Sequence, residues 1–466
     1  MCSSDPARDR FFSGVHVNAT RRAAAYAVAI AVVVVGCGSG SIHGRSAADS
    51  SGVVAMSSPA SASPAPPPAS ASVVSPSASA SIVDPSAGTA AALIGDHWSQ
   101  LPAAPIAHRE AGVLVWTGTH LLVWGGASDG RSDATLYADG ASYDPATKTW
   151  ATLPAAPISA RTQMGWVWTG SSLVVFGGYG SVASDGTVAP LADGAIYTPS
   201  TNSWRKLPVA PLSPRFNPDL VWTGHEVLVV GGEPADESLD GPGYAAGEAA
   251  YDPSSNRWRK LPAMPSTVGH DIRHLRAMVT DRGIYVGQLW QHVTTDGDST
   301  ELEAGTDFVI YDPTQNTWTK REISAATLND QPAGLDGVTV AGDQLLVLPG
   351  QGWHGDGSTW PPSFGQHGYR LDLASGTSRA MSPGPIDVTD PLGVWTGSAM
   401  LEYTGTIGSS LDGGPTTGAG ESAVWDPETD VWTALPTAPG AQFGDNAVWA
   451  GDRLLEWGLG GLQFGP

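Results

Sequence analysis

Short apolar runs separated by tight polar turns recur along the chain from residue 93 onward. Three copies read VLVWTGTHLLVWGG, GWVWTGSSLVVFGG and DLVWTGHEVLVVGG. Looser copies read AMVTDRGIYVGQ, GVTVAGDQLLVLPG, LGVWTGSAMLEYTG and NAVWAGDRLLEWG. Apolar runs joined by two-residue links such as Thr-Gly are typical of β-hairpins. The pattern therefore predicts seven hairpins of short strands.

A second element follows the hairpins and ends on a tryptophan. Its copies read YDPATKTW, YTPSTNSW, YDPSSNRW, YDPTQNTW and WDPETDVW, so that a leading aromatic such as Tyr143 stands seven positions before Trp150. The degenerate copy LDLASGTS has Leu371 and Ser378 at the same spacing. With the lone strand around Trp98, these segments predict seven closing strands, one for each hairpin.

The double glycine, the following Tyr-Asp-Pro and the closing tryptophan resemble kelch repeats over nearly all of residues 93–466. The double glycine is missing from copies four to six, and the fifth copy lacks both aromatics. The resemblance implies an all-β fold: a seven-bladed β-propeller of four-stranded antiparallel blades around a central channel. A six-bladed ring with extra hairpins is the alternative.

The two ends of the repeat region are predicted to share one blade. The chain enters it with a closing strand near Trp98 and leaves it with a hairpin and a short GLQF run. Pairing of the N- and C-terminal strands would close the ring and remove a free sheet edge. The repeating aromatics are predicted to be core, because burial of one large apolar side chain stabilises by roughly 1.5–3 kcal/mol.

Residues 1–37 have the layout of a signal peptide. Arginines precede an apolar run from Ala23 to Val35, and small residues follow. The run is too short for a membrane-spanning helix, which needs about 20 residues. Val34-Val35-Gly36-Cys37 resembles a bacterial lipobox, which implies cleavage before Cys37 and its acylation. The alternatives are an ordinary signal peptide with an incidental cysteine and an uncleaved anchor.

Residues 38–92 consist almost entirely of Ser, Ala, Pro and Gly with short apolar residues. Such a composition buries too little apolar surface to order a chain, so the segment is predicted to be a disordered tether. A chain of this length spans on the order of 40 Å. We therefore expect a globular head, residues 93–466, to be held away from a membrane, or to be secreted if Cys37 is not acylated.

Charge and cysteine content exclude several classes of function. The chain has 45 acidic and 23 basic residues, and its formal net charge of −22 argues against nucleic acid and against broad attraction to anionic membranes. Its two cysteines, Cys2 and Cys37, both precede the repeats, so neither a disulfide framework nor a cysteine-ligated metal is expected in the head. No cofactor and no metal are predicted.

The blade pattern places short turns on one face of the propeller and long connections on the other. Binding residues favour variable loops on a rigid scaffold, so the long-loop face is the candidate functional face. Two groups of residues on it are candidate ligand contacts. The first lies at the channel mouth and comprises Arg109, Arg161, Arg215, His270, Asp271, Arg273 and His274. Converging cations suit a carboxylate or phosphate, whereas the alternative for the three arginines is a structural role in hydrogen bonds to the backbone.

The second group lies in the loop QGWHGDGSTWPPSFGQHG and comprises Trp353, His354 and Trp360. Exposed aromatics suit sugar rings or a peptide, but such side chains also fold back onto a blade. Nearby, WQHVTTDGDSTELEAG is predicted to be another long loop. Its acids match no EF-hand loop, so a solvated acidic turn is expected there in place of a calcium site.

Two classes of function fit these features. The first is a lipid-anchored binding or scaffold protein, expected to have a monomeric head, that presents the loop face to a protein or glycan outside the cytoplasm. The second is a sugar-acting enzyme similar to the kelch-type sialic acid epimerases, with His270, His274, Arg161 and Arg215 as acid, base and binding groups. The chain has no serine nucleophile elbow, phosphate loop or His-Glu-x-x-His motif, which favours binding over catalysis.

Overall fold

The computed structural model describes residues 97–128, 134–182, 188–234, 245, 247–265, 271–280, 282–296, 299–321, 338–348, 368–385, 391–404, 422–438, 447–457 and 461–465. The segments 1–37 and 38–92, with Cys37, lie outside the described residues. Regular structure within the described residues is β-strand, apart from one 3-10 turn, η2 (Pro199–Thr201). None of the described residues forms a helix of the length and apolar character needed to cross a membrane.

The described strands form seven four-stranded antiparallel sheets, numbered here as blades 1 to 7 along the chain, and one two-stranded sheet. Blade 1 contains β2 (Val113–Trp116), β3 (Leu121–Trp124), β4 (Gly140–Asp144) and β5 (Thr149–Thr152). Blade 2 contains β6 (Gly165–Trp168), β7 (Leu173–Phe176), β10 (Gly194–Thr198) and β11 (Ser203–Lys206), and between them β8 (Tyr179–Val182) pairs with β9 (Val188–Pro190). Blade 3 contains β12 (Asp219–Trp222), β13 (Val227–Val230), β14 (Ala249–Asp252) and β15 (Arg257–Lys260).

Blade 4 contains β16 (Asp271–Thr280), β17 (Gly283–Asp296), β18 (Ser299–Asp312) and β19 (Thr317–Arg321). Blade 5 contains β20 (Val338–Ala341), β21 (Gln344–Val347), β22 (Tyr369–Asp372) and β23 (Ser378–Ala380). Blade 6 contains β24 (Pro391–Trp395), β25 (Met400–Thr404), β26 (Ser422–Asp426) and β27 (Val431–Ala434). Blade 7 contains β28 (Ala447–Trp449), β29 (Leu454–Glu456), β30 (Leu462–Gly465) and β1 (His97–Gln100).

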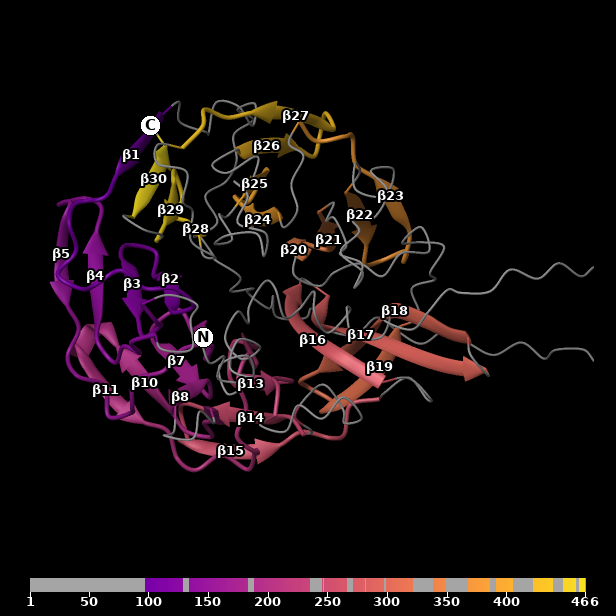
Figure 1. The fold of residues 1–466 in the computed structure, drawn as a ribbon, viewed down its shortest axis with the longest axis horizontal. Helices are drawn as coiled ribbons and strands as arrows, with labels where there is room; N and C mark the ends of the chain where they lie inside the picture. Colours follow the sequence, from indigo (N-terminus) through magenta and orange to yellow (C-terminus); the bar gives the residue numbers. More distant parts are fainter. Residues whose placement is uncertain are drawn as a thin grey trace, which may run out of the picture.

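The blades stand in a ring with the first strand of each nearest the centre (Figure 1). Each first strand contacts the first strands of the two neighbouring blades, and β2 contacts both β6 and β28, so the ring is closed. The core lies between blades, where buried side chains of one sheet pack on the next, as Val113, Leu122 and Trp124 of blade 1 do on Leu173 and Val175 of blade 2. The prediction of a seven-bladed propeller is confirmed, and the six-bladed alternative is wrong.

Blade 7 is assembled from both ends of the described chain. Its strand order is β1-β30-β29-β28, and β1 pairs with β30 from His97↔Gly465 to Gln100↔Leu462. The ring of Trp98 packs on Phe464 with centroids 4.9 Å apart. The indole Nε1 of Trp98 also donates to the carbonyl oxygen of Pro436 in blade 6 at 2.7 Å. The short GLQF run is thus a paired strand, as the closing pattern predicted.

The repeated aromatic pairs are structural. Tyr143 lies directly opposite Trp150 across β4 and β5, with ring centroids 5.0 Å apart. The indole Nε1 of Trp150 donates to the carbonyl oxygen of Pro102, which follows the closing strand of the preceding blade, at 2.9 Å. The indole N–H groups of Trp258 and Trp318 make the equivalent bonds to Pro208 and Pro262. Each of these tryptophans therefore fills a core and ties its blade to the one before it.

In blades 3 and 6 the leading aromatic of the motif donates a hydrogen bond to a residue of the closing turn. Asn256 has a left-handed φ of 55°, and its Oδ1 accepts a hydrogen bond from the hydroxyl of Tyr251 at 2.8 Å. In blade 6 the aromatic is Trp425, whose Nε1 donates to Oδ1 of Asp430 at 3.0 Å, and Asp430 has a φ of 56°. Asn and Asp tolerate this backbone conformation and supply an acceptor. The change from YDP to WDP thus keeps the same bond between strand and turn.

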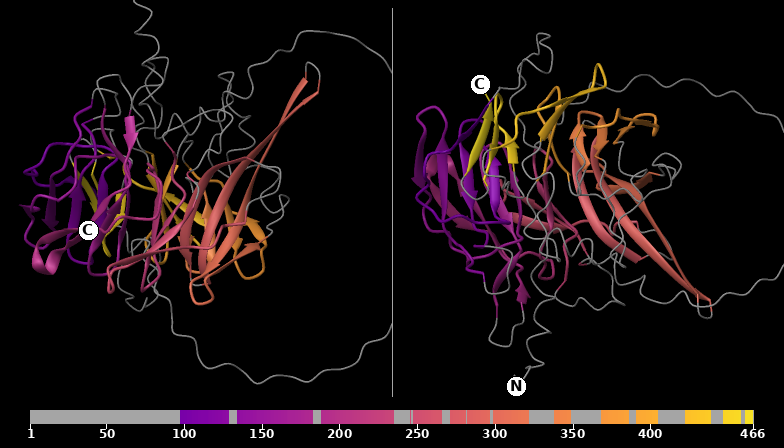
Figure 2. Two further views of the ribbon diagram at one scale, coloured as in Figure 1. Left: turned by 90° about the horizontal axis from the view of Figure 1, so that it is seen from below. Right: turned by 45° about the horizontal axis from the view of Figure 1, so that its top comes forward.

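Blade 4 departs from the others because its two middle strands are long. Both β17 and β18 have 14 residues, and their pairing continues to Asp296↔Ser299, far beyond the last pair with β16, Asp271↔Gln291. The resulting two-stranded ribbon extends well beyond the rest of the propeller (Figure 2). The prediction of a long loop over residues 290–305 is therefore wrong. The β-branched run before an Asp-Gly turn signal favours a hairpin and explains the difference.

Candidate functional site: the long-loop face

Strand order assigns each connection to one of two faces. Within each blade successive strands are antiparallel, so the links β2–β3 and β4–β5 lie on one face, and the link β3–β4 and the connection to the next blade lie on the other. We call these the short-turn face and the long-loop face. The connection β3–β4 runs over residues 125–139, whereas the turn β2–β3 takes only residues 117–120.

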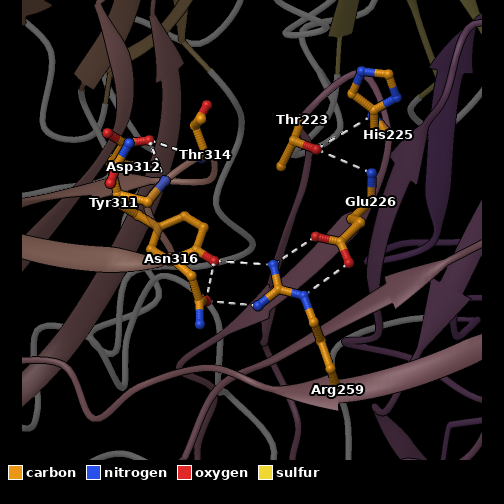
Figure 3. A network of polar contacts seen from close by, with 9 residues as sticks. Thr223, His225, Glu226, Arg259, Tyr311, Asp312, Thr314 and Asn316 are labelled. Atoms are coloured by element: carbon orange, nitrogen blue, oxygen red, sulfur yellow. Dashed lines mark hydrogen bonds and ion pairs between the residues drawn. The ribbon is translucent and has the colours of Figure 1, made fainter.

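The short-turn face is occupied by polar contacts between blades (Figure 3). Arg259 of β15 donates from Nε and Nη2 to the two carboxylate oxygens of Glu226 at 2.8 and 2.6 Å. The same guanidinium donates to the hydroxyl of Tyr311 at 3.0 Å and to Oδ1 of Asn316 at 2.6 Å, both in blade 4. The hydrogen bond with Glu226 is the main reason that the pKa of Arg259 is raised above its usual value.

The same arrangement recurs one blade earlier, where Arg205 of β11 donates to the hydroxyl of Tyr251 at 2.9 Å and to the amide oxygen of Asn256. Further along, Arg370 donates to the carbonyl oxygen of Pro427 at 3.0 Å and lies 5.0 Å from the ring centroid of Trp425. These arginines join neighbouring blades, so the short-turn face carries a structural belt.

The predicted arginines of the long-loop face are buried beneath it. Arg161 is fully buried, and its Nη1 donates to the carbonyl oxygens of Gly177 and Asp193, both at 3.1 Å. Its Nη2 donates to Oδ1 of Asp193 at 2.8 Å and to Oγ of Ser159 at 3.3 Å. Arg161 thus holds the connection between β7 and β10 to the segment that enters blade 2.

Arg109 and Arg215 make the corresponding contacts in blades 1 and 3. Arg109 donates from Nη1 to Oδ1 of Asp139 at 2.7 Å and to the carbonyl oxygen of the same residue at 3.1 Å. Arg215 donates from Nη1 to the carbonyl oxygens of Gly231 and Gly247 at 2.8 and 3.0 Å. These contacts are the ones expected of the structural role, and both guanidinium groups are buried.

Burial sets the acid–base properties of these groups. Desolvation lowers the pKa of Arg215 to about 10, against the attraction of Glu248. Burial likewise raises the pKa of the Glu248 carboxyl, although Arg215 opposes the rise. For Asp193 burial also favours the neutral acid, but the hydrogen bonds and charges of Arg161 and Lys206 together outweigh it and lower the pKa. Asp193 is therefore ionised at neutral pH beside Arg161.

Two positions after each of these three arginines, the backbone has a left-handed conformation. Ala111, Gln163 and Asn217 precede the first strands of blades 1, 2 and 3, and all have left-handed φ values, of 48°, 52° and 48°. The N–H of Gln163 donates to the carbonyl oxygen of Ala111 at 3.3 Å, and the N–H of Asn217 donates to that of Gln163 at 2.8 Å. Residues held in this conformation cluster at functional sites. The three blades thus place equivalent residues side by side on the long-loop face.

The remaining predicted site residues are less fully placed. Asp271, Arg273 and His274 lie on β16, at the end of the first strand of blade 4 that faces the long-loop side. His270, Trp353, His354 and Trp360 lie outside the described residues. The described residues contain no group of three His, Cys, Asp or Glu side chains arranged to hold a metal ion. Ligand binding by these seven residues stays a prediction.

Besides Glu248, two buried carboxylates on second strands of blades escaped the sequence reasoning. Glu402 of β25 is 1 % exposed, and Glu456 of β29 is fully buried. Both occupy the third position of the second strand, which is Val123 in blade 1 and Val175 in blade 2. The sequence did indicate them, because the segments MLEY and LLEW have a glutamate where the corresponding segment LLVW has a core valine.

The family comparison agrees with this geometry. Residues 93–287 match a family model described as the KLHDC2/KLHL20/DRC7 Kelch-repeats domain. This part of the chain is therefore similar to kelch-repeat domains. Among solved structures, the chain titled "Structure of YjhT" is similar, with 16% identity and a TM-score of 0.47, and the match covers 72% of this chain and 100% of that one. No curated protein matches the chain. A kelch propeller fold suggests a protein-binding or scaffold role.

Proposed function

We propose that this kelch propeller is an exported, lipid-anchored binding or scaffold protein that presents its long-loop face to a protein or glycan outside the cytoplasm. The observation that carries the proposal is the difference between the two faces. Short turns and inter-blade arginine contacts occupy one face. The other face receives the long connections and the ribbon of blade 4.

The N-terminal sequence supports the cellular part of the proposal. A basic segment and an apolar run precede Cys37, and a Ser/Ala/Pro-rich segment follows it. Acylation of Cys37 would attach the chain to a membrane, and the tether would let the head reach on the order of 40 Å from it. We expect Cys37→Ser to move the full-length chain from the membrane fraction to the soluble fraction without changing the thermal unfolding of the head. A chain that stays in the membrane fraction would contradict the anchor alone.

The binding part is tested with the full-length chain and a variant that lacks one long connection. Tyr403 and Ser422 lie directly opposite each other on β25 and β26. Residues 405–420 can therefore be replaced by a two-residue Asn-Gly link with the strands kept in register. A matched control inserts Gly-Ser after Gly118 in the turn β2–β3 on the short-turn face.

Both variants and the parent chain are cross-linked in envelope extract and applied to a glycan array. We expect the recovered protein or glycan to be lost or weakened with the shortened connection and retained with the control. Recovery of the same set by all three chains, or of nothing by any chain, would overturn the proposed function. Equal melting temperatures of the parent and the shortened variant show that the propeller is intact.

A further inference from the structure

The outer part of the ribbon consists of two strands without a described neighbour. Pairing of β16 with β17 ends at Asp271↔Gln291, and pairing of β19 with β18 ends at Phe308↔Arg321. Beyond these pairs β17 and β18 bond to each other as far as Asp296↔Ser299. Among the described residues no strand lies along the outer edges of 292–296 and 299–307. We call residues 292–303 of this hairpin the ribbon tip.

Two strands alone are marginal in water, because each has only one partner and little surface to bury. Their outer edges present rows of backbone N–H and C=O groups that favour the addition of another strand. Proteins protect such edges with charged side chains, lysine above all, and with proline, β-bulges or covering segments. Residues 283–312 contain neither lysine nor proline. The ribbon tip therefore has the backbone geometry of a strand-accepting edge.

The charge of the segment restricts what can be added. Residues 283–312 contain six acidic residues and no arginine or lysine. Asp307, near the blade, pairs with Lys320 at 3.5 Å, whereas Asp296, Glu301 and Glu303 belong to the tip. A second copy of this chain, with a net charge of −22, is repelled, and so is any other acidic strand. A basic strand is attracted by charge and held by backbone hydrogen bonds.

We propose that the ribbon tip docks a basic, extended segment of a partner protein, which adds as a further strand along its edge. The proposal rests on the proposed binding function and names one contact site and the chemistry of its partner. Main-chain bonds would provide most of the attachment, and the acidic residues would select a lysine- or arginine-rich segment over others.

The test uses a synthetic peptide of about ten residues that alternates lysine and threonine, with a glutamate–threonine peptide of the same length for comparison. Binding to the full chain is followed by fluorescence anisotropy at low and at physiological salt. In the truncated variant, residues 292–303 are replaced by Asn-Gly, which joins Gln291 to Ala304, the pair that lies opposite in the ladder. This variant keeps the four paired strands of blade 4.

A charge control separates the tip from the general acidity of the chain. Asp296→Asn, Glu301→Gln and Glu303→Gln remove three of the four acidic charges of the tip, and Asp343→Asn, Glu428→Gln and Asp452→Asn remove the same number of charges from turns of the short-turn face. We expect the lysine peptide to bind at least about tenfold more weakly to the truncated chain and to the first triple variant than to the parent and to the second triple variant. The glutamate peptide should not bind.

A lysine peptide with N-methyl groups at alternate residues cannot form the edge ladder and should bind more weakly than the parent peptide by a similar factor. Equal binding of this peptide would show that charge alone acts, and equal binding to the truncated chain would place the contact elsewhere. Either result overturns the proposal, as does a dimer of the chain that disappears on truncation. Loop-dependent partners recovered by the full chain would still support the proposed function in these cases.

Discussion

In blades 2 and 3, a serine two residues before the buried arginine completes the hydrogen bonds of that arginine. Two residues before Arg161 and Arg215, the hydroxyl oxygens of Ser159 and Ser213 accept hydrogen bonds from Nη2 at 3.3 and 3.2 Å. The residue at this position before Arg109 is Ala107, and within the described part of the chain Nη2 of Arg109 is buried without a hydrogen-bond partner. A buried donor of this kind destabilises the fold by about 1–3 kcal/mol.

Ala107→Ser should therefore stabilise the protein. The new hydroxyl is expected to accept a hydrogen bond from Arg109, which contributes about 0.5–1.5 kcal/mol. The reverse change, Ser159→Ala, should lower stability by a similar amount. Urea unfolding of the parent chain and of both variants measures the two effects. An unchanged or lower midpoint for Ala107→Ser would contradict this account of Arg109.

At the level of single strands, Glu402 on β25 departs from the repeat, because blades 1 and 2 have valine at this position. Its neighbours across the sheet are Gly393 and Ala423, which offer no polar side chain, and neither of its carboxylate oxygens has a hydrogen-bond partner among the described residues. A Cβ on Gly384, in the connection from blade 5, would lie 3.6 Å from Oε2. Burial in these surroundings raises the pKa of Glu402 from 4.5 to about 7.

This shift makes stability depend on pH. Between pH 4.5 and about 7 the unfolded chain loses the proton of this carboxyl while the folded chain keeps it, so stability falls as pH rises through that range. Above pH 7 both states are ionised and the loss reaches its full value, on the order of 3 kcal/mol. Glu402→Val, which restores the residue of blades 1 and 2, should remove this dependence and raise stability at pH 8.

Urea unfolding at pH 5 and pH 8 measures the change. Glu428→Val provides the matched control, because it makes the same substitution at an exposed turn between β26 and β27 and should leave the difference between the two pH values unchanged. A parent chain that is equally stable at both pH values, or a Glu402→Val chain that keeps the parent's difference, would contradict the account of this residue.

For the whole propeller, the seam in blade 7 decides whether the ring stays closed. Phe464 of β30 is 1 % exposed and belongs to a core that also contains Leu401 and Tyr403 of blade 6. Its ring lies beside Trp98, the first tryptophan of the described chain. The packing of Phe464 thus joins both ends of the chain to the preceding blade.

Phe464→Ala should destabilise the whole ring by about 3–5 kcal/mol, because it leaves a cavity at the contact that closes the circle. We expect one unfolding transition at a lower temperature and faster proteolysis near β1. Val431→Ala changes a half-exposed strand residue and should leave the transition nearly unchanged. Loss of a small separate transition, with the main one unmoved, would show that blade 7 unfolds apart from the ring.

Much of this architecture could be predicted from the sequence because the propeller is repetitive. Each blade forms the same strands and turns. The Thr-Gly links, the Tyr-Asp-Pro turn and the closing tryptophan mark these elements in several copies. The structural role of the aromatics followed from the same repetition. The ribbon of blade 4 was mistaken for a loop because it occurs in one blade only, where no other copy guides the assignment.

Apart from the ribbon of blade 4, the sequence by itself determined the strands, the number of blades and the pairing of the two ends, because repeated turn chemistry and periodic apolar residues specify them. Only the tertiary structure decided what the polar residues do. Arg109, Arg161 and Arg215 are buried among backbone carbonyls from connections 16 or more residues away, and Glu402 lies in a core where no described residue hydrogen-bonds its carboxylate. The burial of a polar group and its hydrogen-bond partners depend on distant segments that meet only in the closed ring. The local sequence pattern therefore does not indicate them.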